Sequence, residues 1–177
     1  MNPDDIPGWN NGQAFYDLII ETLPPKSKVL EMGVFYGRGL VYLAQNSDFE
    51  IYGVDSFIAP STPYLKDDVK TNEDFYEACM SNLFKFGVQR QVTLIPLNSE
   101  RASKLFQDQS LDCVFIDGEH SYEPVVQDIG LWRTKVKPGG YLSGDDYGEP
   151  WGGVIKAVDE LFPERTIVPN WTWYVKL

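Results

Sequence analysis

The sequence predicts an α/β fold in one domain spanning residues 1–177, with a mostly parallel sheet of seven strands, helices on both faces and a C-terminal antiparallel β-hairpin. Three observations predict this class. Short apolar runs alternate with segments in which apolar residues recur every three or four positions, as strands alternate with helices. Several of these runs end in glycine or in an acidic residue, which is typical of the ligand-binding edge of such sheets. Residues 166–177 alternate around Pro169 and Asn170, which indicates the hairpin.

The composition narrows the kind of partner. The chain has 43% apolar and 14% aromatic residues, as a globular protein does, and a formal net charge of −11 at pH 7. That charge opposes any binding that depends on neutralising phosphates, so we expect no nucleic acid partner. The N-terminus lacks a signal-peptide pattern, apolar runs are too short to span a membrane, and only two cysteines occur. We therefore expect a cytoplasmic protein that binds no membrane and acts on a small neutral or cationic molecule.

Residues 1–10 are rich in Pro, Asp and Gly and predict an arm without regular structure. A helix follows from Gly12, because apolar residues then recur at helical spacing until Pro24 and Pro25 end the pattern. We expect this helix to cover one edge of the sheet.

A glycine-rich loop follows the first strand. Val29 and Leu30 form the strand, Gly33 allows a sharp turn, and Gly37 and Gly39 leave room for a ligand to approach the backbone. The next helix, to residue 46, directs its free N–H groups toward the same crevice. The spacing differs from the G-x-G-x-x-G of dinucleotide sites, and Glu31 precedes the first glycine; a carboxylate suits an ammonium group better than a pyrophosphate. A purely structural turn is the alternative.

Residues 50–56 predict the second strand, which ends in Asp55 and Ser56. A parallel crossover places Asp55 at the same end of the sheet as Val34. Because Rossmann-like sites use a carboxylate about 20 residues beyond the loop to bind ribose hydroxyls, we predict this role for Asp55. A helix cap is the alternative, but the residues that follow do not begin a helix.

Residues 57–72 predict an irregular lid or substrate loop. Thr71 to Asp74 resemble a capping box that begins a helix containing Cys79 in the core. Residues 92–97 predict the third strand, and Ser99 then either caps the next helix or, with Glu100, contacts a ligand.

The second informative stretch covers residues 111–122. The apolar run at 113–116 predicts a central strand that ends abruptly in Asp117, and Ser121 then caps a helix. We expect that helix to carry Val136 on its apolar face and to end at residues 137–140. Residues 141–147 predict the fifth strand, which contains Asp145 and Asp146, and residues 151–162 predict the last helix.

These motifs resemble the class I S-adenosylmethionine (SAM) dependent methyltransferases, which have a Rossmann-like sheet. The sequences at 115–122, 137–140 and 144–146 resemble in particular the small-molecule metal-dependent O-methyltransferases, including macrocin-type sugar O-methyltransferases and, more distantly, catechol O-methyltransferase. The resemblance implies methyl transfer to a hydroxyl group of a small polar molecule such as a sugar. It implies that the following residues contact SAM: Glu31, Gly33, Val34, Gly37, Asp55, Ser56, Ser99, Glu100 and Asp117. Ser99 and Glu100 would lie at the adenine.

The resemblance also implies a metal site formed by Asp117, Asp145 and Asp146. Three carboxylates at neighbouring strand ends repel one another, and a hard divalent cation, Mg²⁺ or Mn²⁺, would relieve that repulsion. His120, the only histidine, follows Asp117 by three residues and has a pKa suited to removing a proton from the acceptor. The alternative is that Asp145 and Asp146 form a turn and that His120 only packs there.

Two other functions stay open from the sequence. One is a nicotinamide-dependent enzyme on the same kind of sheet, which the glycine spacing disfavours. The other is a catalytically inactive protein that binds SAM or a partner, because fold does not fix function. The chain is shorter than the O-methyltransferases that it resembles, so the acceptor and the oligomeric state, including a homodimer, stay open as well.

Overall fold

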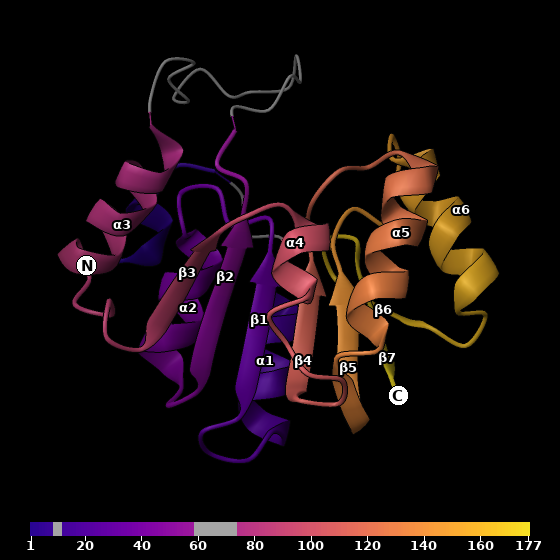
Figure 1. Ribbon diagram of the computed structural model, residues 1–177, viewed down its shortest axis with the longest axis horizontal. Helices are drawn as coiled ribbons and strands as arrows, with labels where there is room; N and C mark the ends of the chain where they lie inside the picture. The colour runs from indigo at the N-terminus through magenta and orange to yellow at the C-terminus, as the bar shows by residue number, and fades with distance from the viewer. Residues whose placement is uncertain (9–11, 59–73) are drawn as a thin grey trace.

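A computed structural model describes residues 1–8, 12–58 and 74–177. Its centre is a seven-stranded sheet with the strand order β3-β2-β1-β4-β5-β7-β6 (Figure 1). The first five strands are mutually parallel, whereas β7 is antiparallel to both β5 and β6. The strands are β1 (Lys28–Met32), β2 (Glu50–Asp55), β3 (Val92–Pro96), β4 (Leu111–Ile116), β5 (Val136–Gly144), β6 (Thr166–Val168) and β7 (Thr172–Lys176).

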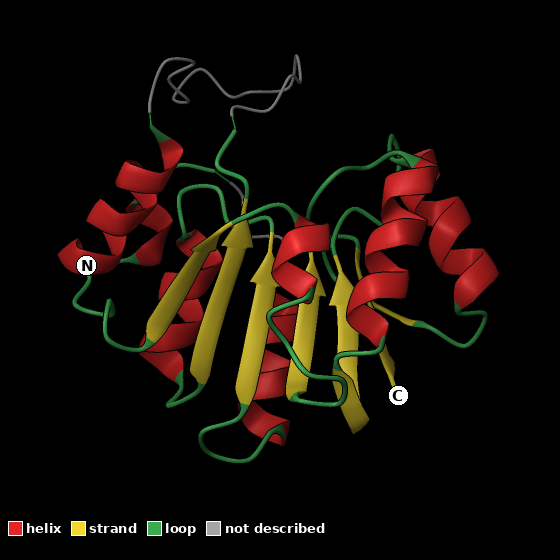
Figure 2. Cartoon of the chain, in the orientation of Figure 1, coloured by secondary structure: helices red, strands yellow, loops and turns green. Residues whose placement is uncertain are grey.

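Helices cover both faces of the sheet (Figure 2). They are α1 (Gln13–Thr22), α2 (Arg38–Asn46), α3 (Phe75–Lys85), α4 (Ser99–Ser103), α5 (Tyr122–Arg133) and α6 (Gly152–Leu161), with a short 3₁₀ turn η1 (Pro3–Asp5) before them. Alternate strand residues point to opposite sides. Val29 and Cys113 therefore belong to the core cluster shared with α1, α2 and α3, while Leu30 and Val114 belong to the one shared with α4, α5 and α6. The predicted α/β class, strand number and terminal hairpin are confirmed.

The strand order places a switch point between β1 and β4. From β1 the chain moves outward to β2 and β3, and it then returns to the other side of β1 as β4. Ligands of such sheets bind in the crevice beyond the carboxyl ends of the strands at this point. The two loops that border the crevice are those after Met32 and after Ile116.

One predicted boundary is wrong. Val136 does not lie on the apolar face of α5, which ends at Arg133, and residues 137–140 do not terminate that helix. They form the first half of β5, in which Val136 pairs with Leu111. The physical reason is tertiary pairing: Leu177 N–H donates to the Gly140 carbonyl over 2.9 Å, so the glycine pair is held in a strand.

Two further expectations about local structure need correction. The first residues are not simply irregular, because Pro3–Asp5 form η1 and Ile6 is buried with 2% exposure. The capping box is also wrong: Asp74 has an extended backbone and is itself the N-cap of α3, accepting a hydrogen bond from Glu77 N–H over 3.2 Å. Most of the proposed lid lies in residues 59–73, outside the described residues. No helix in the described part of the chain is both long and apolar enough to cross a membrane.

Candidate active site

Gly33 is the point where the loop after β1 touches the loop after β4. Its φ is +91°, and a Cβ atom on it would lie only 1.5 Å from the backbone oxygen of Asp117. Gly33 N–H also donates to the Val54 carbonyl over 2.9 Å, which ties the loop to β2. A side chain at this position would push the two loops apart, so the sharp turn depends on glycine.

The other two glycines serve the packing of the protein itself. A Cβ atom on Gly37, whose φ is +80°, would lie 2.8 Å from the Cys79 sulfur. A Cβ atom on Gly39 would lie 2.5 Å from Glu31 Oε2. Side chains of α3 and β1 therefore fill the space that a side chain at these two positions would occupy. The contact of Gly37 with a ligand stays a prediction.

Glu31 is a buried carboxylate without full hydrogen bonding. It is 5% exposed, and Oε2 has no hydrogen-bond partner among the described residues. Burial raises the pKa of Glu31 to about 8; the Asp55 charge adds to the rise, and a hydrogen bond from Tyr16 opposes it. A buried carboxyl group with one unpaired oxygen beside the glycine loop is complementary to a cationic group such as an ammonium.

Asp55 organises the glycine loop. Its Oδ2 accepts hydrogen bonds from the N–H groups of Val34 and Phe35, each over 2.9 Å, and its Oδ1 accepts one from Phe57 N–H over 2.7 Å. A carboxylate can accept about four hydrogen bonds, so it keeps capacity for a ribose hydroxyl. Asp55 therefore lies where the sequence placed it, and Ser56 follows it as an exposed residue. The ribose contact itself stays a prediction.

Ser99 and Glu100 lie at the start of α4. The N-cap of this helix is Asn98, whose side chain accepts from Arg101 N–H over 3.0 Å, so the alternative of a Ser99 cap is wrong. Ser99 Oγ instead accepts a hydrogen bond from the Trp132 indole N–H over 2.9 Å, which links α4 to α5. Glu100 is exposed and pairs with Lys104 one turn later. The adenine contacts of Ser99 and Glu100 stay predictions.

The carboxyl ends of β4 and β5 bring a cluster of polar side chains together. One ligand atom from each of Asp117, His120 and Asp146 lies within 4.8 Å of the other two. Asp145 lines the same small hollow, but its Oδ1 accepts a hydrogen bond from Thr172 Oγ over 3.3 Å and it does not belong to the converging set. Burial, and then the charges of Asp145 and Asp146, raise the pKa of Asp117 well above its ordinary range.

His120 is held in place from two sides. Its Nε2 lies 2.7 Å from Asp146 Oδ2, and its ring stacks on the Trp151 indole with 4.0 Å between centroids. The start of α6 packs closely behind it, because a Cβ atom on Gly153 would lie 2.4 Å from the His120 carbonyl oxygen. These contacts fix both the position of the imidazole and the plane of its ring.

Sequence reasoning missed three residues that shape this region. Trp151 appeared only as the start of a helix, and its contact with His120 carries no local sequence signal. Tyr16 on α1 hydrogen-bonds to Glu31 on β1, and no residue spacing within a single element predicts a contact between two elements. Asn98 could have been found, because an asparagine just before a helical segment is a common N-cap.

Comparison with known proteins agrees with the fold described above. A family model described as a methyltransferase domain matches residues 30–147, which is more than half of the chain. An uncharacterized protein, R132, of Acanthamoeba polyphaga mimivirus is 29% identical over 137 residues, or 75% of this chain, and the chain spans 58% of the length of that relative.

Solved structures share the fold. An rRNA methylase from Streptococcus thermophilus superposes with a TM-score of 0.70 at 14% identity, covering 95% of this chain and 96% of the other. A SAM-dependent O-methyltransferase from Thermotoga maritima gives a TM-score of 0.65 at 16% identity, covering 97% of this chain and 66% of the other. With the family match over both loops that border the crevice, the chain belongs to the class I SAM-dependent methyltransferases.

Proposed function

We propose that this methyltransferase transfers the methyl group of SAM to a hydroxyl group of a small polar molecule such as a sugar, assisted by Mg²⁺ or Mn²⁺. The observation that supports this most is the convergence of Asp117, His120 and Asp146 beyond the strand ends. This cluster adjoins the glycine loop between β1 and α2 (residues 33–37), which we also call the cofactor loop, because the Gly33 backbone lies against the Asp117 backbone. Metal ligands and a base are thus held next to the place where a methyl donor would lie.

The residues of the glycine loop fit SAM. Glu31 would offer the ammonium group of the cofactor its buried Oε2, which has no hydrogen-bond partner among the described residues, and binding there would satisfy that acceptor. Asp55 fixes the backbone of Val34 and Phe35 and has capacity left for the ribose. Gly33 keeps this loop against the backbone of Asp117, so a cofactor bound at the loop would lie beside that residue.

The polar cluster fits a divalent cation. Asp117 and Asp146 supply the carboxylate oxygens that Mg²⁺ prefers, and an ion would offset the repulsion that raises the pKa of Asp117. A bound ion would lower the pKa of the acceptor hydroxyl and fix the position of its oxygen. An imidazole in the ligand set would favour transition metals, so we assign His120 to proton transfer and the carboxylates to the ion.

His120 is positioned to act as the base. If Nε2–H donates to Asp146, the lone pair of Nδ1 is available to accept the proton of the acceptor hydroxyl. The acceptor oxygen forms a bond to the methyl carbon as the carbon–sulfur bond breaks, and the electron pair of that bond moves to sulfur. The products are the methyl ether, S-adenosylhomocysteine (SAH) and a protonated His120. Stacking on Trp151 keeps the ring in one orientation during this transfer.

RNA methylation is the second candidate, because the fold resembles an rRNA methylase as closely as an O-methyltransferase. The net charge of −11 favours the small molecule, since an RNA backbone requires a cationic surface. An inactive SAM-binding protein is a third reading, and only turnover separates it from an enzyme.

The test begins with thermal shift of the purified chain against SAH, NAD and NADP, each with and without Mg²⁺. We expect a shift with SAH and none with the nicotinamides. SAH release is then measured with glycosides, catechols and a short structured RNA as acceptors. Turnover with a hydroxylated small molecule and none with RNA is expected, and the reverse result would overturn the proposal.

A further inference from the structure

The first eight residues, which we call the N-terminal clasp (residues 1–8), are fixed to the body of the protein. Asn2 Oδ1 accepts a hydrogen bond from Asp4 N–H over 3.1 Å, which caps η1. Ile6 is 2% exposed and belongs to the core on the side of α1, α2 and α3. The clasp is therefore an ordered part of the fold.

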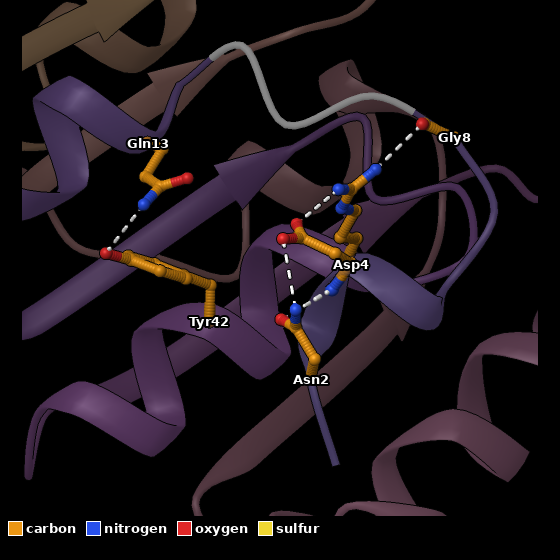
Figure 3. A network of polar contacts seen from close by, with 6 residues as sticks. Asn2, Asp4, Gly8, Gln13 and Tyr42 are labelled. Atoms are coloured by element: carbon orange, nitrogen blue, oxygen red, sulfur yellow. Dashed lines mark hydrogen bonds and ion pairs between the residues drawn. The ribbon is translucent and has the colours of Figure 1, made fainter.

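Arg38 links the clasp to the cofactor loop. It is the first residue of α2 and directly follows Gly37. One guanidinium nitrogen donates to the Gly8 carbonyl over 3.0 Å, and the other forms an ion pair with Asp4. The positions of Asn2, Asp4 and Gly8 around this contact can be followed in Figure 3, which also shows the hydrogen bond from the Gln13 side chain to the Tyr42 hydroxyl.

The position of this arginine is electrostatically unfavourable without Asp4. The N-terminus of a helix carries partial positive charge, so a cation in the first turn is repelled. Arg38 Nε is also buried without a hydrogen-bond partner among the described residues, which costs free energy. No acidic side chain lies in the first turn of α2, and the side-chain partners of Arg38 among the described residues are Asp4 and Gly8 of the clasp.

The clasp touches the loop at a second point. Gly8 has φ +106°, and a Cβ atom on it would lie 3.2 Å from the Phe35 ring. Phe35 N–H is one of the two loop amides that Asp55 holds. The clasp thus packs against the side chain of a loop residue whose backbone amide is held by Asp55.

We propose that Arg38 is a positioning residue, which holds the N-terminal clasp against the glycine loop so that clasp docking and cofactor binding stabilise each other. The proposal rests on SAM binding at this loop, as inferred above. Coupling of this kind is reciprocal: docking of the clasp strengthens cofactor binding, and the bound cofactor makes opening of the clasp less favourable by the same free energy. Arg38 acts through the loop and does not touch the reacting atoms.

The test uses the full chain and SAH as the probe. Calorimetry should give a dissociation constant about threefold higher for Asp4→Asn and about tenfold higher for Arg38→Gln, since the second change removes both the ion pair and the carbonyl contact. Arg38→Lys should fall between wild type and Arg38→Gln, because lysine can pair with Asp4 but lacks the forked guanidinium. Combining Asp4→Asn with Arg38→Gln should cost no more than Arg38→Gln alone.

Hydrogen exchange supplies a readout that a merely structural role would not move. Asp5 and Ile6 donate their amide hydrogens within the clasp, to Asn2 and Pro3. In the wild type, saturating SAH should slow exchange at these amides by about threefold or more, and in Arg38→Gln it should not. Asp108→Asn is the matched control: its ion pair with Lys135 joins a 71% exposed carboxylate to a 16% exposed cation, against 59% and 18% for Asp4 and Arg38.

The outcomes separate this proposal from the cofactor assignment. Wild-type protein that does not bind SAH would overturn both. The coupling proposal alone would be overturned if the wild type binds SAH, Arg38→Gln binds it with unchanged affinity, and SAH does not change hydrogen exchange at the clasp amides. An equal loss of affinity in Asp108→Asn would show a general stability effect and would also overturn it.

Discussion

Glu31 is an acidic side chain placed where water does not reach it. Its neighbours are the backbone of Gly39, the Tyr16 hydroxyl and, further away, the charge of Asp55. None of these is a cation, so the ionised form is poorly stabilised until a positive group arrives. Ionised Glu31 should therefore destabilise the free protein, and a bound ammonium group should remove that destabilisation.

This cost predicts a pH dependence of stability. The pKa of Glu31 rises from an ordinary 4.5 to about 8 in the folded state. Below about pH 4.5 both states hold the proton and the full stability is present. As pH rises toward 8 the unfolded state releases the proton more easily, so stability is lost, by about 2 to 4 kcal/mol between pH 5 and pH 8. Denaturant unfolding at several pH values measures it.

Glu31→Gln is the control for this effect, since glutamine keeps the shape and does not titrate. The slope of stability against pH should be shallower in the variant than in the wild type, and the difference isolates Glu31 from Asp117, whose pKa is also raised. Parallel curves for the two proteins would contradict the prediction.

His120→Ala tests the base. Removing the imidazole should lower kcat by about 10²-fold, because general-base catalysis contributes roughly that much. SAH affinity should change little, since His120 contacts Asp146 and Trp151 and lies outside the glycine loop. Rate measurements at saturating acceptor and SAM decide the matter. An unchanged kcat in the variant would remove His120 from the mechanism.

At the scale of elements, β2 and the loop after β1 form one unit. Asp55, at the end of β2, accepts hydrogen bonds from two loop amides and from Phe57 N–H beyond it. The loop thus takes its shape from a strand about 20 residues further along the chain. This arrangement makes the cofactor loop sensitive to a substitution that lies outside it.

Asp55→Ala should weaken SAH binding at least tenfold. The substitution removes an acceptor from part-buried loop amides and from the predicted ribose contact, and each group left unpaired costs on the order of 1 to 3 kcal/mol. Calorimetry gives the affinity, and thermal unfolding shows how much of the loss comes from the loop itself. An unchanged dissociation constant would rule out the ribose contact.

At the scale of the whole molecule, the strand order assembles the site. β4 lies between β1 and β5, so Asp117, Glu31 and the residues after Gly144 meet at one edge although they are far apart in the chain. Helix α6 then closes the site from outside, with Trp151 against His120.

Removal of metal tests this assembly. EDTA should abolish turnover while the SAH dissociation constant stays within about twofold, because the ion would contact the acceptor rather than the cofactor. Asp146→Asn should raise the Mg²⁺ concentration needed for half-maximal rate by about tenfold or more, and Asp145→Asn by less, since Asp145 faces Thr172. Full activity in EDTA would exclude the metal, and equal effects of both variants would restore Asp145 as a ligand.

The sequence by itself determined the α/β class, the glycine turn and the strand-end positions of Asp55 and Asp117. These follow from local rules: apolar periodicity reports which face is buried, and glycine or an acid marks where a strand stops. The same rules located residues 141–144 in a strand. They placed residues 136–140 in the wrong element because propensity favours a turn at Lys-Pro-Gly-Gly.

Tertiary structure decided which side chains meet. Successive residues after a strand point in different directions, so the roles of Asp145 and Asp146 depend on how β5 pairs with β7. Asp145 accepts a hydrogen bond from Thr172 of β7, whereas Asp146 contacts His120. The need for glycine at position 39 likewise depends on Glu31, eight residues earlier on another element. Such contacts are fixed by strand order and helix packing, which no spacing within a single segment contains.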